Sequence, residues 1–435
     1  MQSLSFKNIT IQTSLALSAA SSLIFEVVAT TVMFFYFTKS SYSIATILAV
    51  FLFGLGVGAA VMHTLIHKVQ QRELLFGVFQ LSVAGYGCLV LANLSAITPH
   101  LSGWGVAVAS LVVLLLPTAI LGAVFPLATA MLQKKDGEVA GMAYASDLAG
   151  AIIGSLLAGF IFIPLWGNRT SILCAIGFNV ISSLLILPRR WKPVSIIVAA
   201  AMAGIVLLTP PAGSQAPFSS TNAPAPDGYQ FYKNSAYGLV TVKDEILSID
   251  NRIQCTFDNN GVGSGVITEF IMARYAIEPL DGGEHRTLNI GLGCGGTLSE
   301  IISYKNIQAD VVEINPVVVS ANRQFSDILN NPRVTLIVDD GLNYLRTATT
   351  QYDSIVVDID NPAVANSSNL YTVEAFKIIH DRLADNGTFA LWEYGGYTDD
   401  NPAYLDVLYY SLREAFPYVY HQQSIFLASR QPLSH

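Results

Sequence analysis

The first half of the chain consists of long hydrophobic runs that follow one another with only short polar breaks. A helix that crosses a lipid bilayer needs about 20 apolar residues, because the hydrocarbon core is about 30 Å thick and each helical residue rises about 1.5 Å. The runs therefore predict an N-terminal all-α polytopic membrane bundle over residues 1–209. The seven predicted spans are, approximately, Ile11–Phe37, Ser43–Ile66, Leu75–Ile97, Gly103–Leu132, Val139–Trp166, Thr170–Leu187 and Val194–Leu208.

Two acidic side chains lie inside these predicted spans, Glu26 in the first and Asp147 in the fifth. An ionisable group in the membrane is costly unless it is paired or hydrated, and no Lys or Arg lies mid-span to neutralise either one. The two acids predict a cation or proton site in the bundle, or alternatively protonated carboxyls that are hydrogen-bonded between helices. The Gly-x-x-x-Gly spacings at 54–58 and 150–154 allow close approach of helices within or between chains.

The composition separates two unlike halves. Only 12% of the 435 residues are charged and 52% are hydrophobic, which is too apolar for an ordinary soluble protein. Residues 210–228 are rich in Pro, Ala and Ser and predict a linker. After it, the patterning predicts a small β-hairpin domain over 229–280 and an α/β Rossmann-like domain over 281–435. A net charge of -8 without a basic stripe argues against nucleic acid as a partner.

Residues 287–296, TLNIGLGCGG, combine a short apolar strand with a glycine loop, and a helical run follows them. Gly291, Gly293 and Gly295 allow a tight turn and close approach of a ligand to the backbone, and the helix offers its unpaired N–H groups. Glu313 ends the next predicted strand, 18 residues beyond Gly295. At this spacing an acid reaches ribose hydroxyls, so the segment predicts a nucleoside-binding site.

Acidic residues also end the two predicted strands that come next. Asp339 and Asp340, followed by Gly341, end one of them, and Asp358 and Asp360 end the other. Ligands of open α/β sheets bind beyond the carboxyl ends of the strands, so three successive acidic strand ends predict a single site. Taken alone, each acid is better explained as a loop or helix-capping residue.

The four cysteines show neither a metal-type nor a disulfide-type pattern. Cys88, Cys174, Cys255 and Cys294 include no C-x-x-C pair and no neighbouring His at the spacing of metal ligands. We therefore expect neither a metal site nor a disulfide framework from them. Independently of the cysteines, we expect no cofactor beyond a sulfonium nucleoside substrate.

From residue 232 onward the chain resembles the spermidine synthases, which are polyamine aminopropyltransferases, and as a whole it resembles their membrane-fused bacterial relatives. The motifs that carry the resemblance are IQCT at 253–256, the glycine loop at 291–296, VEIN at 312–315, Asp340-Gly341, Val357-Asp358 with Asn361-Pro362, and Leu370-Tyr371. The family transfers an aminopropyl group from decarboxylated S-adenosylmethionine to putrescine and releases methylthioadenosine. The resemblance implies that Glu313 binds the ribose and Asp340 the adenine amino group. It also implies that Gln254 lies near the ligand and that Asp358 accepts a proton from the attacking amine.

The chain departs from this family on the side of the substrate tail and the acceptor. Where this chain has Cys294, the family's glycine loop carries an acid that grips the aminopropyl ammonium. The second acid that the family has after Asp358 is replaced by Asn361, and Asp360 lies one position early. Neutral Cys294 would neither attract that ammonium nor repel the carboxylate of intact S-adenosylmethionine.

Few acceptor residues of the family remain. The loop after IQCT is longer and glycine-rich and retains only Glu269. Trp392 and Glu393 follow a later predicted strand, where they either rebuild part of an acceptor site or pack in the core.

Three functions fit these features. The first is a transferase of the aminopropyl type with an unusual acceptor, which uses a nucleoside and a polyamine. The second is an enzyme that cleaves S-adenosylmethionine to methylthioadenosine and homoserine lactone without a second substrate. The third is a non-catalytic nucleoside sensor coupled to a transporter-like bundle. All three place the protein in a lipid bilayer, and a homodimer is compatible with each.

We expect the predicted bundle to lie in a bacterial inner membrane. Positively charged residues are distributed unevenly between its two sides. Eight lie on the N-terminal side and two on the other. The eight are Lys7, Lys68, Arg72, Lys134, Lys135, Arg189, Arg190 and Lys192, and the two are Lys39 and Arg169. The positive-inside rule puts the N-terminus in the cytoplasm, and seven spans then put the C-terminal domain outside. The supply of a nucleoside ligand favours the cytoplasm for this domain, and on that ground we expect it there.

Overall fold

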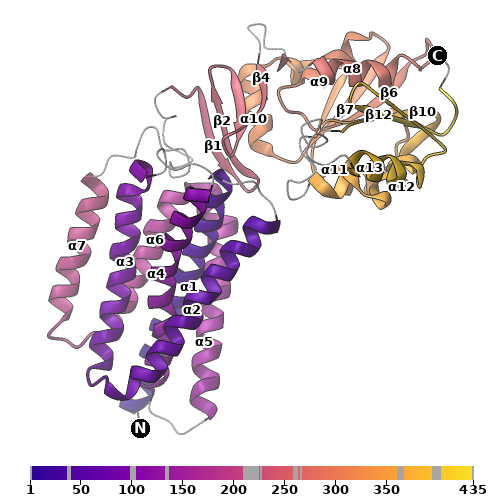
Figure 1. The fold of residues 1–435 in the computed structure, drawn as a ribbon. Coiled ribbons are helices and arrows are strands. Elements are labelled where there is room, and N and C mark those ends of the chain that lie inside the picture. The colour runs from indigo at the N-terminus through magenta and orange to yellow at the C-terminus, as the bar shows by residue number, and fades with distance from the viewer. Residues whose placement is uncertain are drawn as a thin grey trace. The chain divides into compact units, whose positions relative to one another are not determined.

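The chain forms two compact units, Met1–Asp227 and Gly228–His435 (Figure 1). This computed structural model describes residues 2–36, 41–97, 104–132, 137–208, 225, 228–257, 263–264, 267–359, 367–393 and 403–433.

All the regular secondary structure in the described residues of the first unit is helical. Its helices are α1 (Gln2–Tyr36), α2 (Ser41–Leu65), α3 (Arg72–Ile97), α4 (Trp104–Thr129), α5 (Gly137–Leu156), α6 (Ile163–Ile186) and α7 (Lys192–Leu208), with a π-helical segment at Leu157–Phe162 and a short 3-10 turn at Ile66–Lys68. Each predicted span overlaps one of these helices. Pro117 and Pro126 lie inside α4.

Three helical stretches in the described residues are long and apolar enough to cross a membrane: Lys7–Thr31, Ile47–Lys68 and Gly141–Ile186. Leu114–Thr129 and Lys192–Ile205 are apolar but shorter. The predicted number of seven membrane-crossing helices therefore stays a prediction, although the helices themselves are present.

Contacts of α1 and α3 show which helix ends lie together. Lys7 of α1 forms an ion pair of 2.8 Å with Glu73 at the start of α3. Arg72 donates a 2.7 Å hydrogen bond to the carbonyl of Ala130, just beyond the end of α4. The start of α1, the start of α3 and the end of α4 therefore lie at one end of the bundle.

Helices α5 and α6 run in opposite directions. A Cβ placed on Gly150 would lie 2.0 Å from the carbonyl oxygen of Ala16, and one on Gly154 would lie 2.3 Å from that of Ala20, so α5 runs parallel to α1. The chain then leaves helical geometry at Gly167, where φ is 76°.

The return of the chain through α6 is fixed by hydroxyl groups. Ser14 of α1 donates a 2.7 Å hydrogen bond to the carbonyl of Ser182, and Ser21 donates one of 3.0 Å to that of Ala175. Since the residue number rises along one helix and falls along the other, α6 is antiparallel to α1. The apolar stretch from 141 to 186 is thus a helical hairpin.

The last helix of the unit is aligned with α3. A Cβ on Gly77 would lie 2.5 Å from the side chain of Leu187, which places the end of α6 near the start of α3. A Cβ on Gly85 would lie 3.0 Å from Met202. Helix α7 therefore runs in the direction of α3 and ends at the opposite end of the bundle from Lys7.

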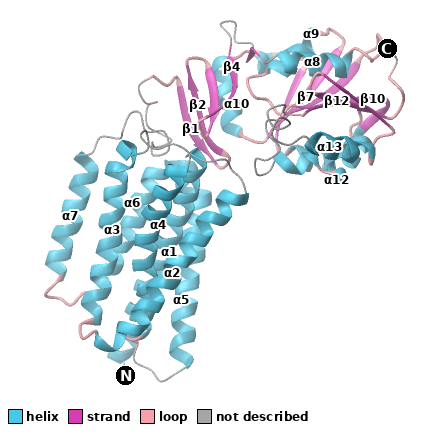
Figure 2. Ribbon diagram, viewed as in Figure 1, coloured by secondary structure: helices cyan, strands magenta, loops and turns pink. Residues whose placement is uncertain are grey.

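The second unit contains an antiparallel sheet of five strands in the order β1-β2-β3-β4-β5 (Figure 2). The strands are β1 (Phe231–Ser235), β2 (Gly238–Lys243), β3 (Ile246–Ile249), β4 (Arg252–Phe257) and β5 (Gly263–Ser264). Asp244-Glu245 and Asp250-Asn251 have positive φ and form the tight turns on either side of β3. Two consecutive residues with positive φ match the twist of a hairpin, and Asp and Asn tolerate that conformation.

The larger sheet has seven strands in the order β11-β12-β10-β9-β6-β7-β8. The five consecutive strands from β10 to β8 in this order are parallel to one another. The strands are β6 (His285–Ile290), β7 (Ile307–Glu313), β8 (Val334–Val338), β9 (Tyr352–Val357), β10 (Leu383–Trp392), β11 (Tyr418–Gln422) and β12 (Ile425–Ser429). The helices are α8 (Ile267–Ile277), α9 (Gly296–Ser303), α10 (Pro316–Phe325), α11 (Gly341–Thr347), α12 (Val373–Arg382) and α13 (Ala403–Arg413), with 3-10 turns at Ile328–Asn330 and Ser367–Tyr371.

Both faces of this sheet are covered. Ile290, Ile355 and Val357 face the core beneath α11, α12 and α13, and Val311 and Val356 face the one beneath α8 and α9. Strands buried on both faces need continuous apolar runs, as IVV at 355–357 supplies. The unit has the Rossmann-like architecture expected from the sequence.

Candidate active site

The parallel strands deliver the predicted site residues to one edge of the sheet. In the register, Ile290 lies opposite both Val312 and Val357, and Glu313 lies opposite Val338. The glycine loop, Glu313, the 339–340 pair and Asp358 therefore follow neighbouring strand ends. The structure thus brings together the acids that lie far apart along the chain.

The glycine loop depends on backbone conformations that other residues rarely adopt. Gly291, Gly293 and Gly295 have φ of 100°, 50° and 86°. A Cβ on Gly291 would lie 2.1 Å from the carbonyl oxygen of Asp358, so the loop passes directly against the end of β9. Helix α9 begins immediately after Gly295, and its first-turn N–H groups face this edge.

Glu313 holds the loop through its backbone. Its Oε2 accepts a 3.0 Å hydrogen bond from the N–H of Leu292, and its Oε1 accepts one of 2.7 Å from the N–H of Asn315. Burial raises the pKa of the Glu313 carboxyl, and the backbone N–H groups of Asn315, Leu292 and Ile314 act against that rise. A carboxylate has about four lone-pair sites, so these three N–H donors leave one for a ribose hydroxyl.

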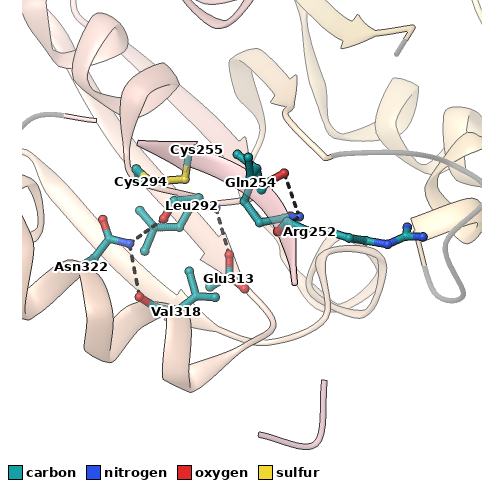
Figure 3. The surroundings of a disulfide bond; sticks show 10 residues. Arg252, Gln254, Cys255, Leu292, Cys294, Glu313, Val318 and Asn322 are labelled. Atoms are coloured by element: carbon teal, nitrogen blue, oxygen red, sulfur yellow. Dashed lines mark hydrogen bonds between the residues drawn. A yellow bond between two sulfur atoms is a disulfide. The ribbon is translucent and has the colours of Figure 1, made fainter. Parts of the chain in front are cut away.

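The loop is also anchored on its other side (Figure 3). Asn322 of α10 donates a 2.6 Å hydrogen bond to the carbonyl of Gly293. Next to it, Cys294 forms a disulfide with Cys255 of β4, with 5.8 Å between the two Cα atoms. The loop is thereby fixed by β7, α10 and β4.

This disulfide corrects the expectation that the cysteines carry none. The two residues are 39 positions apart, and only the folded chain brings the small sheet against the glycine loop. Cys294 is 2% exposed, and as a disulfide it is neutral at every pH. It therefore stays neutral where the resemblance would place an acid.

The two acids after β8 serve as local caps. Asp340 is the N-cap of α11, and its Oδ1 accepts a 2.8 Å hydrogen bond from the N–H of Asn343. Asp339 accepts bonds from the N–H of Asp340 at 2.8 Å and from the side chain of Asn343 at 3.1 Å. A Cβ on Gly341 would lie 2.5 Å from Ile290, so the start of α11 packs closely on the end of β6.

Asp358 follows the end of β9, where its backbone carbonyl lies against Gly291 of the glycine loop. Its N–H donates a 2.9 Å hydrogen bond to the carbonyl of Ile290, which continues the pairing of β9 with β6. Its Oδ2 accepts a 2.6 Å bond from the hydroxyl of Thr297 in α9. Burial raises the pKa of the Asp358 carboxyl to about 6, and the Thr297 hydroxyl acts against that rise. This acid is suited to accept a proton near neutral pH.

The remaining predicted site residues surround this centre. Gln254 lies on β4, and its side chain donates long hydrogen bonds of 3.4 and 3.5 Å to the carbonyls of Arg252 and Ile253. Glu269 lies in the first turn of α8 and is half-buried. Asp360 and Asn361 lie outside the described residues.

Glu393 is part of a pair that the sequence did not reveal. It follows β10, the neighbour of β9, and its Oε2 is hydrogen-bonded to the Nε2 of His421 on β11. Glu393 is 4% exposed. Tyr371 donates to the carbonyls of Ile359 and Trp392, at 3.0 and 3.4 Å, and so links the ends of β9 and β10.

Nothing local marks His421 in the sequence, since it lies in a short strand 28 residues away from Glu393. Trp392 is half-buried and packs against the core beneath α8 and α9.

The two acids of the predicted spans are not brought together. Asp147 of α5 lies level with residue 13 of α1, because Gly150 and Gly154 contact Ala16 and Ala20. Residue 26 is 13 positions further along α1, which is about 20 Å at the helical rise of 1.5 Å. Glu26 and Asp147 therefore do not form one site, and a role for either in ion or proton binding stays a prediction.

Residues 274–421 match the family described as the Spermine/spermidine synthase domain. A polyamine aminopropyltransferase 1 of Streptomyces coelicolor is 23% identical over 395 residues, which covers 85% of this chain and 73% of that relative. A polyamine aminopropyltransferase of Corynebacterium efficiens is 25% identical over 423 residues, which covers 88% of this chain and 77% of that relative. A crystal structure of spermidine synthase in complex with the transition state analogue AdoDATO is 19% identical, with a TM-score of 0.41, over 47% of this chain and 74% of that one.

Proposed function

We propose that this chain, which belongs to the spermidine synthase-like family, is a membrane-integrated transferase that moves an aminopropyl group from decarboxylated S-adenosylmethionine to an amine and releases methylthioadenosine. The observation that carries the proposal is Asp358, a carboxylate with a raised pKa of about 6 that lies against the glycine loop. Its position at the strand end, next to the glycine loop, supports the role of proton acceptor.

The transfer reaction requires few catalytic groups from the protein besides a proton acceptor. The sulfonium of the donor is already an activated leaving group, so the enzyme must orient the amine and take its proton. A bond forms between the amine nitrogen and the γ-carbon of the propyl group, and the bond from that carbon to sulfur breaks. Methylthioadenosine leaves as a neutral thioether, and Asp358 receives the proton lost by nitrogen.

The nucleoside is held, in this proposal, by the edge formed by β6, β7 and β8. Glu313 binds the ribose through the carboxylate lone pair that its backbone hydrogen bonds leave free. Asp340 accepts from the adenine amino group while it caps α11 through its Oδ1. The glycine loop allows the ligand to approach the backbone, and Asp339 and Gly341 shape the same edge.

The acceptor amine enters, in this proposal, on the side of β10. Glu393 follows β10, the strand that pairs with β9, and is hydrogen-bonded to His421, so the region combines a buried carboxylate with an imidazole. Glu269 is the other acidic candidate in the described residues.

Membrane integration is supported by the surface of the helical unit. Large apolar side chains are exposed on several helices, among them Phe53 (63%), Leu89 (61%), Phe160 (77%) and Ile197 (68%). Such exposure is unfavourable in water and suits the hydrocarbon of a bilayer. We propose that all seven helices cross the membrane.

A second function is favoured by one observation, the neutral disulfide in the glycine loop. An acid at position 294 would repel the carboxylate of intact S-adenosylmethionine by about 4 kcal/mol at 4 Å and an effective dielectric of 20. Because Cys294 carries no charge, intact S-adenosylmethionine can enter, and its own carboxylate can attack the γ-carbon. The products of this step are homoserine lactone and methylthioadenosine.

The deciding experiment incubates the detergent-purified full chain with each sulfonium donor, with and without putrescine, and follows methylthioadenosine by chromatography. We expect product only with the decarboxylated donor together with the amine. Product from S-adenosylmethionine alone, lost in Asp358→Asn, would establish the lyase instead. If no product forms under any condition while nucleoside binding is intact, the result would support the non-catalytic sensor.

A further inference from the structure

The disulfide between half-buried Cys255 and buried Cys294 lies in the second unit, Gly228–His435, which we call the soluble unit. Cys294 lies in an apolar cluster with Phe231, Val240 and Val318, and Cys255 packs against the same cluster. Forming the bond removes two protons and two electrons from the thiols, and a disulfide-carrying oxidoreductase that is itself reduced to the dithiol can take them up. Protein disulfides of this structural kind persist in oxidising compartments and are rare in the cytosol.

The direction of the helices gives a second, independent observation. The ion pair between Lys7 and Glu73 and the hydrogen bond from Arg72 to Ala130 define one end of the bundle. Helix α7 begins at that same end and runs parallel to α3, so its last residues lie at the opposite end. The chain therefore leaves the bundle, toward the soluble unit, from the end opposite to Lys7.

The charges distinguish the two ends. The connections at the end that contains Lys7 carry eight Lys and Arg residues, and those at the other end carry two. Positively charged connections remain in the cytoplasm. The end from which α7 leads to the soluble unit is thus the extracytoplasmic one.

From these two observations we infer that the nucleoside site opens to the oxidising, extracytoplasmic side of the membrane and takes its nucleoside from there. The disulfide and the charge distribution arise from different parts of the chain, and both lead to the same side. This reverses the expectation drawn from ligand supply. The inference rests on the proposed function in one respect, which is that the glycine-loop site binds a nucleoside.

Two measurements on the full chain in cells test on which side of the membrane the nucleoside site lies. In the first, a phosphatase reporter that is active only outside the cytoplasm is fused after His435, and a fluorescent reporter that folds only in the cytoplasm is fused at the same position in a parallel strain. We expect activity from the first and none from the second. The opposite pattern would overturn the inference.

The second measurement counts free thiols in acid-quenched cells by the gel shift of a maleimide-polymer adduct under denaturing conditions. Wild type should add two adducts, at Cys88 and Cys174, and four after reduction. The matched variant with Cys88→Ala and Cys174→Ala should add none before reduction and two after it. Four adducts in unreduced wild type would contradict an oxidising location.

Neither measurement depends on catalysis, so the two proposals can fail separately. A chain without transferase activity that shows the expected reporter pattern and two protected thiols supports the extracytoplasmic site. An active transferase with a cytoplasmic reporter pattern overturns the site's location and leaves the proposed function standing.

Discussion

The hydroxyl of Thr297 donates a 2.6 Å hydrogen bond to Oδ2 of Asp358, and this bond joins the first turn of α9 to the carboxyl end of β9. It stabilises the charged form of the carboxylate, while burial raises the pKa to about 6. The balance of these two effects sets the pH at which the proposed proton acceptor becomes available.

The activity of the full chain should therefore rise with pH through about 6. Below that value kcat/KM should fall about tenfold per pH unit, since only the deprotonated acid accepts a proton. Thr297→Val removes the bond that lowers the pKa, so the acidic limb should move to higher pH. The pH profile of kcat/KM measures both effects, with Ser299→Ala in the same helix as the control. An unmoved limb in Thr297→Val would contradict the assignment.

The same carboxylate should lower stability at neutral pH. Its folded pKa of about 6 exceeds the ordinary 3.8, so the folded state binds more protons between these values. Stability should then increase as pH falls from about 6 toward 4 and be lowest above 6. Asp358→Asn should raise the free energy of unfolding at pH 7.5 by about 1–3 kcal/mol while activity is lost. Denaturant unfolding at pH 7.5 and pH 4 measures this, and destabilisation at pH 7.5 would count against it.

Glu313→Ala should weaken binding of methylthioadenosine roughly ten- to a hundredfold, because a lost charge-assisted hydrogen bond costs about 1.5–3 kcal/mol. The variant also frees the N–H of Leu292, so the glycine loop loses one of its anchors. Calorimetry without divalent cations measures the affinity. Glu300→Ala in α9 is the matched control, because its carboxylate faces Arg274 on the surface. Equal affinity in wild type and Glu313→Ala would exclude this site.

Gly291→Ala should destabilise the soluble unit and abolish nucleoside binding. At φ of 100° a Cβ would be strained, and it would also lie 2.1 Å from the carbonyl oxygen of Asp358. We expect a loss of more than about 2 kcal/mol in the free energy of unfolding. Gly282→Ala is the control, because a Cβ there meets no atom within 4 Å. Thermal melts of both variants, with and without methylthioadenosine, provide the comparison, and similar melts would contradict the close approach.

His421→Leu should destabilise the fold by about 1–3 kcal/mol, because it leaves the buried carboxylate of Glu393 without this partner. Glu393→Gln combined with His421→Leu should cost less than the sum of the two single changes. A double-mutant cycle on unfolding free energies measures the coupling. Additive effects would show that the two side chains do not support each other.

Several features of this protein follow from the sequence alone, because they depend on local pattern. Apolar runs of membrane length specify helices wherever they occur, and the strand before Gly291 needs only its short buried run. The spacing from Gly295 to Glu313 is set by one helix and one strand, so an acid at that distance lands beside the glycine loop. For the same reason Asp358 could be predicted at the edge that the structure shows.

Other features depend on contacts between distant segments, which no local pattern encodes. Cys255 and Cys294 meet only because β4 packs against the loop after β6, and His421 reaches Glu393 only because β11 returns beside β12. Glu26 and Asp147 look equivalent in the sequence, but the parallel packing of α1 and α5 separates them. Periodicity and spacing report what a segment does with its near neighbours, whereas side-chain pairs across the fold are decided by how whole strands and helices pack.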